Sequence, residues 1–130
     1  MLKRIFNCLT NKKYKGIPVW FMRQAGRHLP EFKSIREENP NFVNLCLNSN
    51  LSFKISMQPA QRYDLDGVII FSDILLINYA LGQNVVFKKS IGPILKDFEI
   101  DKFLEVEEDE FIKRLEPVYK AINKVKNNSK

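Results

Sequence analysis

Two short apolar runs that alternate with amphipathic stretches are the feature that most constrains the fold of this 130-residue chain. Residues 19–22 (Val-Trp-Phe-Met) and 67–71 (Gly-Val-Ile-Ile-Phe) have the length and composition of strands, and the second is typical of a strand buried on both faces. Strands that alternate with helices indicate βα units and a parallel sheet, hence an α/β fold. The pattern predicts helices over residues 2–10, 30–38, 51–63 and 74–80.

Local signals mark where several of these helices begin and end. A proline suits the first turn of the helix over 30–38. The polar triplet 48–50 is typical of an N-cap for the next helix, in which Pro59 is expected to introduce a kink. Gly82 ends the helix that precedes it, and a short extended piece is expected at 84–88.

The clearest helical pattern lies near the end of the sequence. Acidic residues open this stretch and lysines close it, as the helix dipole favours. Apolar residues recur in it at helical spacing, so that they form one stripe that we expect to face a core. The stripe consists of Phe111, Leu115, Val118, Ile122 and Val125.

Arg23 and Arg27 follow the first apolar run and are separated by Gln24, Ala25 and Gly26. A guanidinium stays charged and offers a rigid fork of donors, so two of them beside a glycine suit an anion with several carboxylates or phosphates. An arbitrary pair of this spacing would more often form surface salt bridges.

Ser72 and Asp73 follow the second apolar run. A carboxylate at the end of a buried strand is costly unless it is paired or has a function. Taken alone, Asp73 would be expected to cap the helix that begins near Ile74. An active-site carboxylate is the other interpretation.

Both stretches together resemble the uroporphyrinogen decarboxylase family. The family pattern P-x-W-x-M-R-Q-A-G-R is present in full at residues 18–27, and the segment 71–75 (Phe-Ser-Asp-Ile-Leu) matches a second family motif. The continuation at 29–32 also resembles the family, which has tyrosine where this chain has His28. The resemblance runs from about Asn7 to Leu95, and more loosely to the end of the chain.

The resemblance implies a (β/α)8 TIM-type barrel, a fold that takes about 250 residues or more. Residues 1–130 would then be the N-terminal portion, about the first third, of a single barrel domain. Because such a piece would expose a sheet edge, we expect it to be poorly folded or oligomeric on its own, and inactive. Its uncovered helix residues would include Phe111, Leu115, Val118 and Ile122.

The implied activity is that of a carboxy-lyase in porphyrin and haem biosynthesis. Members of the family convert the four acetate side chains of uroporphyrinogen III to methyl groups, which gives coproporphyrinogen III, without a metal or an organic cofactor. Arg23 and Arg27 would bind the carboxylate arms, and Asp73 would stabilise the cation that forms on a pyrrole ring. Gln24, Ala25 and Gly26, counted with the substrate-binding residues, would supply the geometry of the loop and could provide a backbone donor. Intact family members are expected to be homodimers.

The proton donor stays open between an arginine and a carboxyl whose pKa burial raises. His28 occupies a family tyrosine position, so we expect it to have a packing or surface role. The family's other active-site tyrosine and histidine would lie beyond Lys130.

The sequence also allows other interpretations. The net charge of +6 suits a polyanionic substrate, whereas a nucleic-acid-binding protein would need clustered lysines interleaved with aromatic residues, which the sequence lacks. A zinc-dependent corrinoid methyltransferase of the same superfamily fits the arginine motif less well. A non-functional truncated gene product is also open.

No apolar run suits a membrane span or a signal peptide, and Cys8 and Cys46 have no metal-site spacing. We therefore expect a cytoplasmic protein without membrane or nucleic-acid partners.

Overall fold

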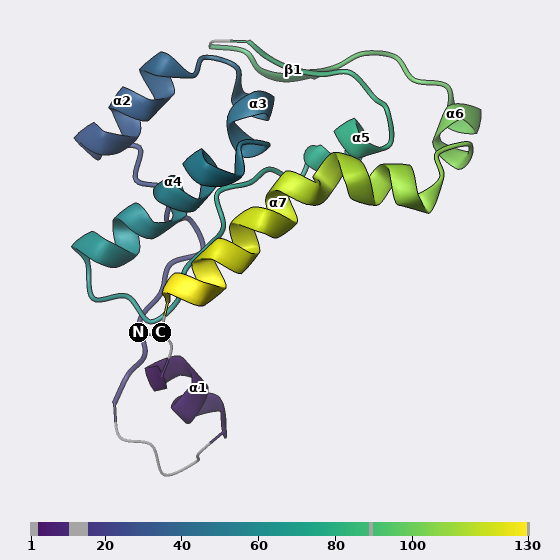
Figure 1. Ribbon diagram of the computed structural model, residues 1–130. Coiled ribbons are helices and arrows are strands. Elements are labelled where there is room, and N and C mark those ends of the chain that lie inside the picture. Colours follow the sequence, from purple (N-terminus) through teal and green to yellow (C-terminus); the bar gives the residue numbers. More distant parts are fainter. Residues whose placement is uncertain (1–2, 11–15, 89, 130) are drawn as a thin grey trace.

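The computed structural model describes residues 3–10, 16–88 and 90–129, which form helices and one short hairpin (Figure 1). In chain order the elements are α1 (Lys3–Thr10), α2 (Pro30–Glu38), α3 (Phe42–Cys46), α4 (Ser49–Arg62), α5 (Leu76–Ala80), β1 (Val85–Lys88), β2 (Gly92–Leu95), α6 (Ile100–Leu104) and α7 (Glu108–Asn128).

The helices with clear sequence signals form close to where they were predicted. Pro30 stands in the first turn of α2. The side chain of Asn48 caps α4 by accepting hydrogen bonds from the backbone N–H groups of Asn50 and Leu51, both at 3.1 Å. These bonds satisfy donors that have no partner within the helix, so α4 begins at a defined residue.

The long helix α7 lies against α4 and α5 (Figure 1). Leu115 and Val125 of its apolar stripe are buried, and Phe111 and Val118 are partly buried. Ile122 is 42% exposed, whereas its neighbour Ala121 is fully buried. The expectation that this stripe lacks cover is therefore wrong for all of the named residues except Ile122.

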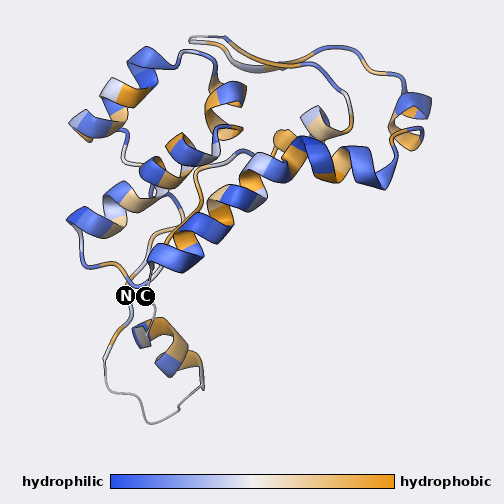
Figure 2. Cartoon of the chain, in the orientation of Figure 1, coloured by the Kyte–Doolittle hydropathy of each residue, from blue (hydrophilic) through white to orange (hydrophobic). Residues whose placement is uncertain are grey.

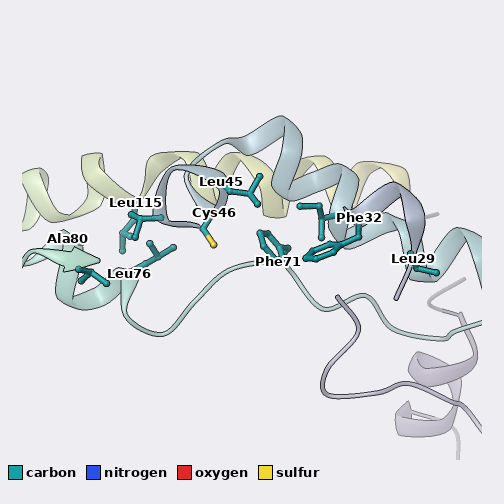
Figure 3. Packing of buried hydrophobic residues seen from close by; sticks show 11 residues of the cluster. Leu29, Phe32, Leu45, Cys46, Phe71, Leu76, Ala80 and Leu115 are labelled. Atoms are coloured by element: carbon teal, nitrogen blue, oxygen red, sulfur yellow. The ribbon is translucent and has the colours of Figure 1, made fainter. Parts of the chain in front are cut away.

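The core lies where α2, α3, α4 and α7 meet the chain around Phe71 (Figure 3). The Phe71 ring is in edge contact with the rings of Phe32 and Phe42, at centroid distances of 6.0 and 5.7 Å. Leu45 and Cys46 are fully buried beside it. Edge-to-face packing of this kind stabilises a core beyond simple burial, so the segment that leads to Asp73 is anchored in the core.

The two apolar runs expected to be strands are extended segments without a β ladder. In the described part of the chain, the sheet is the antiparallel hairpin of β1 and β2, in which Val85 pairs with Leu95. The expected piece at 84–88 is thus confirmed as β1, but the expected parallel pair does not form here. A strand needs a neighbour with matching backbone groups. These two segments are joined mainly by side chains, with one backbone hydrogen bond at their start, from the N–H of Asp66 to the carbonyl of Val19.

Both extended segments contain apolar residues (orange in Figure 2), and several of these side chains are exposed to solvent. Trp20 and Phe21 are 48% and 59% exposed, and Met22 is 76% exposed. Within residues 3–10, 16–88 and 90–129, none of the helices combines the length and hydrophobicity that a membrane span requires.

Candidate functional site

Successive residues of the arginine loop, residues 23–27, are alternately exposed and buried. Arg23, Ala25 and Arg27 are exposed, whereas Gln24 and Gly26 are buried. The two guanidinium groups therefore lie on the exposed side of the same short loop. Neither forms an ion pair with any residue that the structure describes.

Gln24, which is only 6% exposed, joins the loop to the second extended segment. Its Nε2 donates a hydrogen bond to the backbone carbonyl of Gly67 at 2.9 Å, and its Oε1 accepts one from the N–H of Ile69 at 2.8 Å. Both polar atoms of the amide are thus bonded to backbone. The side chain therefore holds the loop, in keeping with the expectation that Gln24 supplies its geometry, and a contact of Gln24 with substrate stays a prediction.

Gly26 packs against Leu29, a core residue that is 2% exposed. A Cβ atom at this position would lie 2.3 Å from Leu29 Cδ1, which is shorter than any real contact. The N–H of Leu29 also donates a hydrogen bond to the Gly26 carbonyl at 2.8 Å. The glycine therefore lets the loop turn closely over the core, whereas the sequence suggested a close approach to a ligand.

Asp73 lies in the turn before α5 and is half-buried. Its Oδ1 accepts a hydrogen bond from the N–H of Leu75 at 2.9 Å, and its carbonyl accepts one from the N–H of Leu76 at 3.2 Å. The carboxylate therefore helps to start the helix, which is the local role that the sequence left open. One carboxylate oxygen is not needed for this turn.

The segment before Asp73 is fixed to α4 by two buried serines. The hydroxyl of Ser52 donates to the carbonyl of Phe71, and the hydroxyl of Ser56 accepts from the N–H of Phe71, both at 2.7 Å. Nothing in the sequence pattern singled out these serines. They hold the backbone two residues before Asp73, so they set the position of its carboxylate.

Asp66 makes a third connection, which sequence reasoning also missed. It is 1% exposed, and its Oδ2 accepts a hydrogen bond from the N–H of Val19 at 2.8 Å. Its other oxygen pairs with Arg4 of α1. The bond from Val19, together with the Arg4 guanidinium, holds the pKa of the Asp66 carboxyl below its ordinary value despite burial.

The thiol of Cys46 is buried in the interior near Asp73, and its pKa reflects that burial. Burial, with a smaller contribution from the negative charge of Asp73, raises the pKa of the Cys46 thiol to about 12. Such a thiol stays protonated and inert. Cys8 is exposed, and the described residues contain no cluster of His, Cys, Asp and Glu that could hold a metal ion.

Among the described residues, no hydrogen bond or ion pair joins Asp73 to Arg23 or Arg27. An open cavity of about 650 Å³ lies between α2 and α4, beside Glu31, Lys54 and Arg62, and none of the three site residues lines it. His28 is exposed and its Nε2 lies 3.0 Å from the hydroxyl of Tyr63, in keeping with a surface role. The arginines and Asp73 are linked through the Gln24 amide and the backbone from Gly67 to Phe71.

The sequence matches the family model described as Uroporphyrinogen decarboxylase (URO-D) over residues 2–130. The chain belongs to the uroporphyrinogen decarboxylase family. This confirms the resemblance that the two motifs indicated.

Relatives named uroporphyrinogen decarboxylase match nearly the whole chain. Those from Rickettsia felis and Rickettsia canadensis are 46% and 47% identical to it over 125 residues, and the one from Rickettsia massiliae is 46% identical over 128. Each alignment covers 96% of this chain but only 36% or 37% of the relative. The chain thus spans little more than a third of the length of these uroporphyrinogen decarboxylases.

Proposed function

We propose that this chain supplies the N-terminal part of a (β/α)8 barrel that decarboxylates uroporphyrinogen III to coproporphyrinogen III. The observation that carries the proposal is the alternation in the arginine loop, which leaves Arg23 and Arg27 exposed on one side while Gln24 fixes the loop. Two exposed guanidiniums on a loop that Gln24 holds suit a substrate whose arms end in carboxylates.

Each decarboxylation needs a place for the electron pair that carbon dioxide leaves behind. When a pyrrole ring of the substrate takes up a proton, it becomes cationic and can accept the pair from the breaking carbon–carbon bond. A second proton then adds to the methylene carbon as the ring loses its extra proton, and an acetate arm has become a methyl group. The net change is the loss of carbon dioxide and the gain of one proton.

Asp73 suits the stabilisation of this cation. One of its oxygens bonds to the N–H of Leu75, which fixes the carboxylate, and the second oxygen can accept the pyrrole N–H groups of the substrate. A fixed negative charge stabilises a charge that develops in the transition state more than it stabilises the ground state. Arg23 and Arg27 bind and orient, and Asp73 acts on the reacting ring.

The exposed apolar side chains of the two extended segments support the barrel. Phe21 and Met22 on the first segment are 59% and 76% exposed, and Ile69 on the second is 37% exposed. Large exposed apolar surface is unusual for a finished domain. In the proposed barrel, further strands cover these residues, the extended segments become the first two strands, and the assembled enzyme is a cytoplasmic homodimer without nucleic-acid or membrane partners.

The test is reconstitution. The chain is co-expressed with the part of the Rickettsia felis relative that lies beyond the matched region, and conversion of uroporphyrinogen III is followed by the appearance of coproporphyrinogen III. We expect turnover from the pair and none from either piece alone. A pair that assembles and shows no turnover would overturn the proposal in favour of a non-functional gene product.

A further inference from the structure

Gln24 differs from its neighbours in the arginine loop because its side chain points into the protein. At 6% exposure, its amide is bonded to the carbonyl of Gly67 and to the N–H of Ile69. These are alternate residues of one extended backbone. The amide therefore bonds to that segment as a neighbouring strand would, with one donor and one acceptor.

The backbones themselves are not bonded at this level. Among the described residues, none of the backbone hydrogen bonds joins residues 20–25 to residues 67–71. The nearest tie is at the start of the two segments, where the N–H of Asp66 donates to the carbonyl of Val19 at 2.8 Å. The Gln24 amide is thus what sets the separation of the arginine loop from the segment that ends at Asp73.

We propose that Gln24 is a positioning residue, whose side-chain amide joins the arginine loop to the second extended segment and sets where Arg23 and Arg27 stand relative to Asp73. The segment to which Gln24 is bonded is also bonded, at Phe71, to Ser52 and Ser56. The position of the arginine loop is therefore coupled to the position of Asp73. The roles of Arg23, Arg27 and Asp73 rest on the proposed function. The two hydrogen bonds of the Gln24 amide to Gly67 and Ile69, called the Gln24 clamp below, do not.

The clamp is tested by amide hydrogen exchange on the 130-residue chain. Gln24→Met keeps the length of the side chain and removes both hydrogen bonds. We expect the amide of Ile69 to exchange at least about tenfold faster in this variant than in the wild type, because it loses its acceptor. Unchanged exchange at Ile69 would overturn the inference, as would an Ile69 amide that is already unprotected in the wild type.

Gln83→Met is the matched control. Gln83 also uses both amide atoms, donating to the carbonyl of Lys96 and accepting from the side chain of Asn78, each at 2.9 Å. It lies near the hairpin, away from the arginine loop. We expect Gln83→Met to leave exchange at Ile69 within about twofold of the wild type, whereas an equal acceleration in both variants would reveal a general loss of stability and contradict the clamp.

Gln24→Glu provides a conservative rescue. When protonated, the introduced carboxyl has one donor and one acceptor and can make both bonds. Its ionised form cannot donate to Gly67, and repulsion between the carboxylate and the Gly67 carbonyl oxygen should move the side chain away from Ile69 as well. Burial raises the pKa of such a carboxyl, so we expect slow Ile69 exchange at pH 5 and fast exchange at pH 8, after correction for intrinsic rates. Asp66 stays ionised at pH 5 because its pKa is lowered. Exchange that is equally fast at both pH values would contradict the inference.

The turnover of the reconstituted pair distinguishes a positioning role of Gln24 from a role in stability alone. At temperatures where all three proteins are fully folded, we expect Gln24→Met to reduce kcat/KM by at least about tenfold and Gln83→Met to leave it unchanged. Equal kcat/KM in the two variants would overturn the positioning role. If the wild-type pair has no turnover, the proposed function fails, and exchange at Ile69 still decides whether the clamp exists.

Discussion

The carboxylate of Asp66 accepts a hydrogen bond from the backbone N–H of Val19 at 2.8 Å, and the N–H of Asp66 donates to the carbonyl of Val19 at the same distance, so Asp66 joins the two extended segments through both its side chain and its backbone. The same carboxylate pairs with Arg4, which ties α1 to this point. One buried charge therefore holds three parts of the chain that are distant in sequence.

This arrangement predicts a loss of stability in acid. Because the pKa of Asp66 is lower in the folded chain than its ordinary value of 3.8, its contribution is present above about pH 4 and is lost as the pH falls through the folded pKa. The free energy of unfolding, measured with urea from pH 7 to pH 3, should fall over this range. Asp66→Asn should be less stable at pH 7 and should show a shallower decline. Because the pKa of Glu31 is also lowered, part of the decline should remain. A decline of unchanged slope in Asp66→Asn would contradict this role.

The two cysteines should differ sharply in reactivity. With a pKa of about 12, only about one Cys46 thiol in ten thousand is ionised at pH 8, and the side chain is fully buried. A thiol reagent at pH 8 should therefore modify one site, the exposed Cys8, and reach Cys46 only when denaturant unfolds the chain. Mass spectrometry of the digested protein identifies the labelled site. Labelling of Cys46 at the same rate as Cys8 in the native chain would refute this burial.

Two glycines should respond differently to alanine. Gly26→Ala forces Leu29 out of place and should reduce the free energy of unfolding by about 1–3 kcal/mol, as overpacking does in other cores. Gly67→Ala is the control, because its new Cβ would lie 3.4 Å from Trp20 Cβ, an ordinary contact. The comparison is made by urea denaturation. Equal effects of the two substitutions would show that Leu29 does not constrain the loop.

The sequence predicted α2, α4 and α7 because each carries a local signal: Pro30, the cap at Asn48, and the apolar stripe of α7. It missed α3, β2 and α6, which are four or five residues long and too short to show a period. The runs at 19–22 and 67–71 have the composition of strands. Whether a strand forms depends on a neighbour, which composition does not reveal.

The site was only partly predictable for a similar reason. The motifs located Arg23, Arg27 and Asp73, because charged residues next to apolar runs stand out. The burial of Asp66 depends on Arg4, 62 residues away in the chain, and the hydrogen bonds of Gln24 depend on a segment more than 40 residues away. Contacts over such separations leave no local pattern, so the sequence indicated no role for Asp66 and did not reveal the hydrogen bonds of Gln24.

Replacement of Arg27 by lysine should weaken substrate binding although the charge is kept. Lysine lacks the planar fork that binds a carboxylate through two hydrogen bonds. In the reconstituted pair we expect KM for uroporphyrinogen III to rise by about tenfold. Arg62→Lys is the control, since Arg62 makes a forked contact with Glu31 outside the loop. An unchanged KM in Arg27→Lys would show that Arg27 makes no such contact with the substrate.

The most direct measurement of the central claim is the turnover of the reconstituted pair with Asp73→Asn. Asparagine keeps an oxygen for the N–H of Leu75, so the turn before α5 should form as before. Because the charge is needed when the pyrrole ring becomes cationic, we expect kcat to fall by at least about a hundredfold while KM changes little. A kcat equal to that of the wild type, in a variant that folds and assembles normally, would contradict the assignment of Asp73 to the reaction.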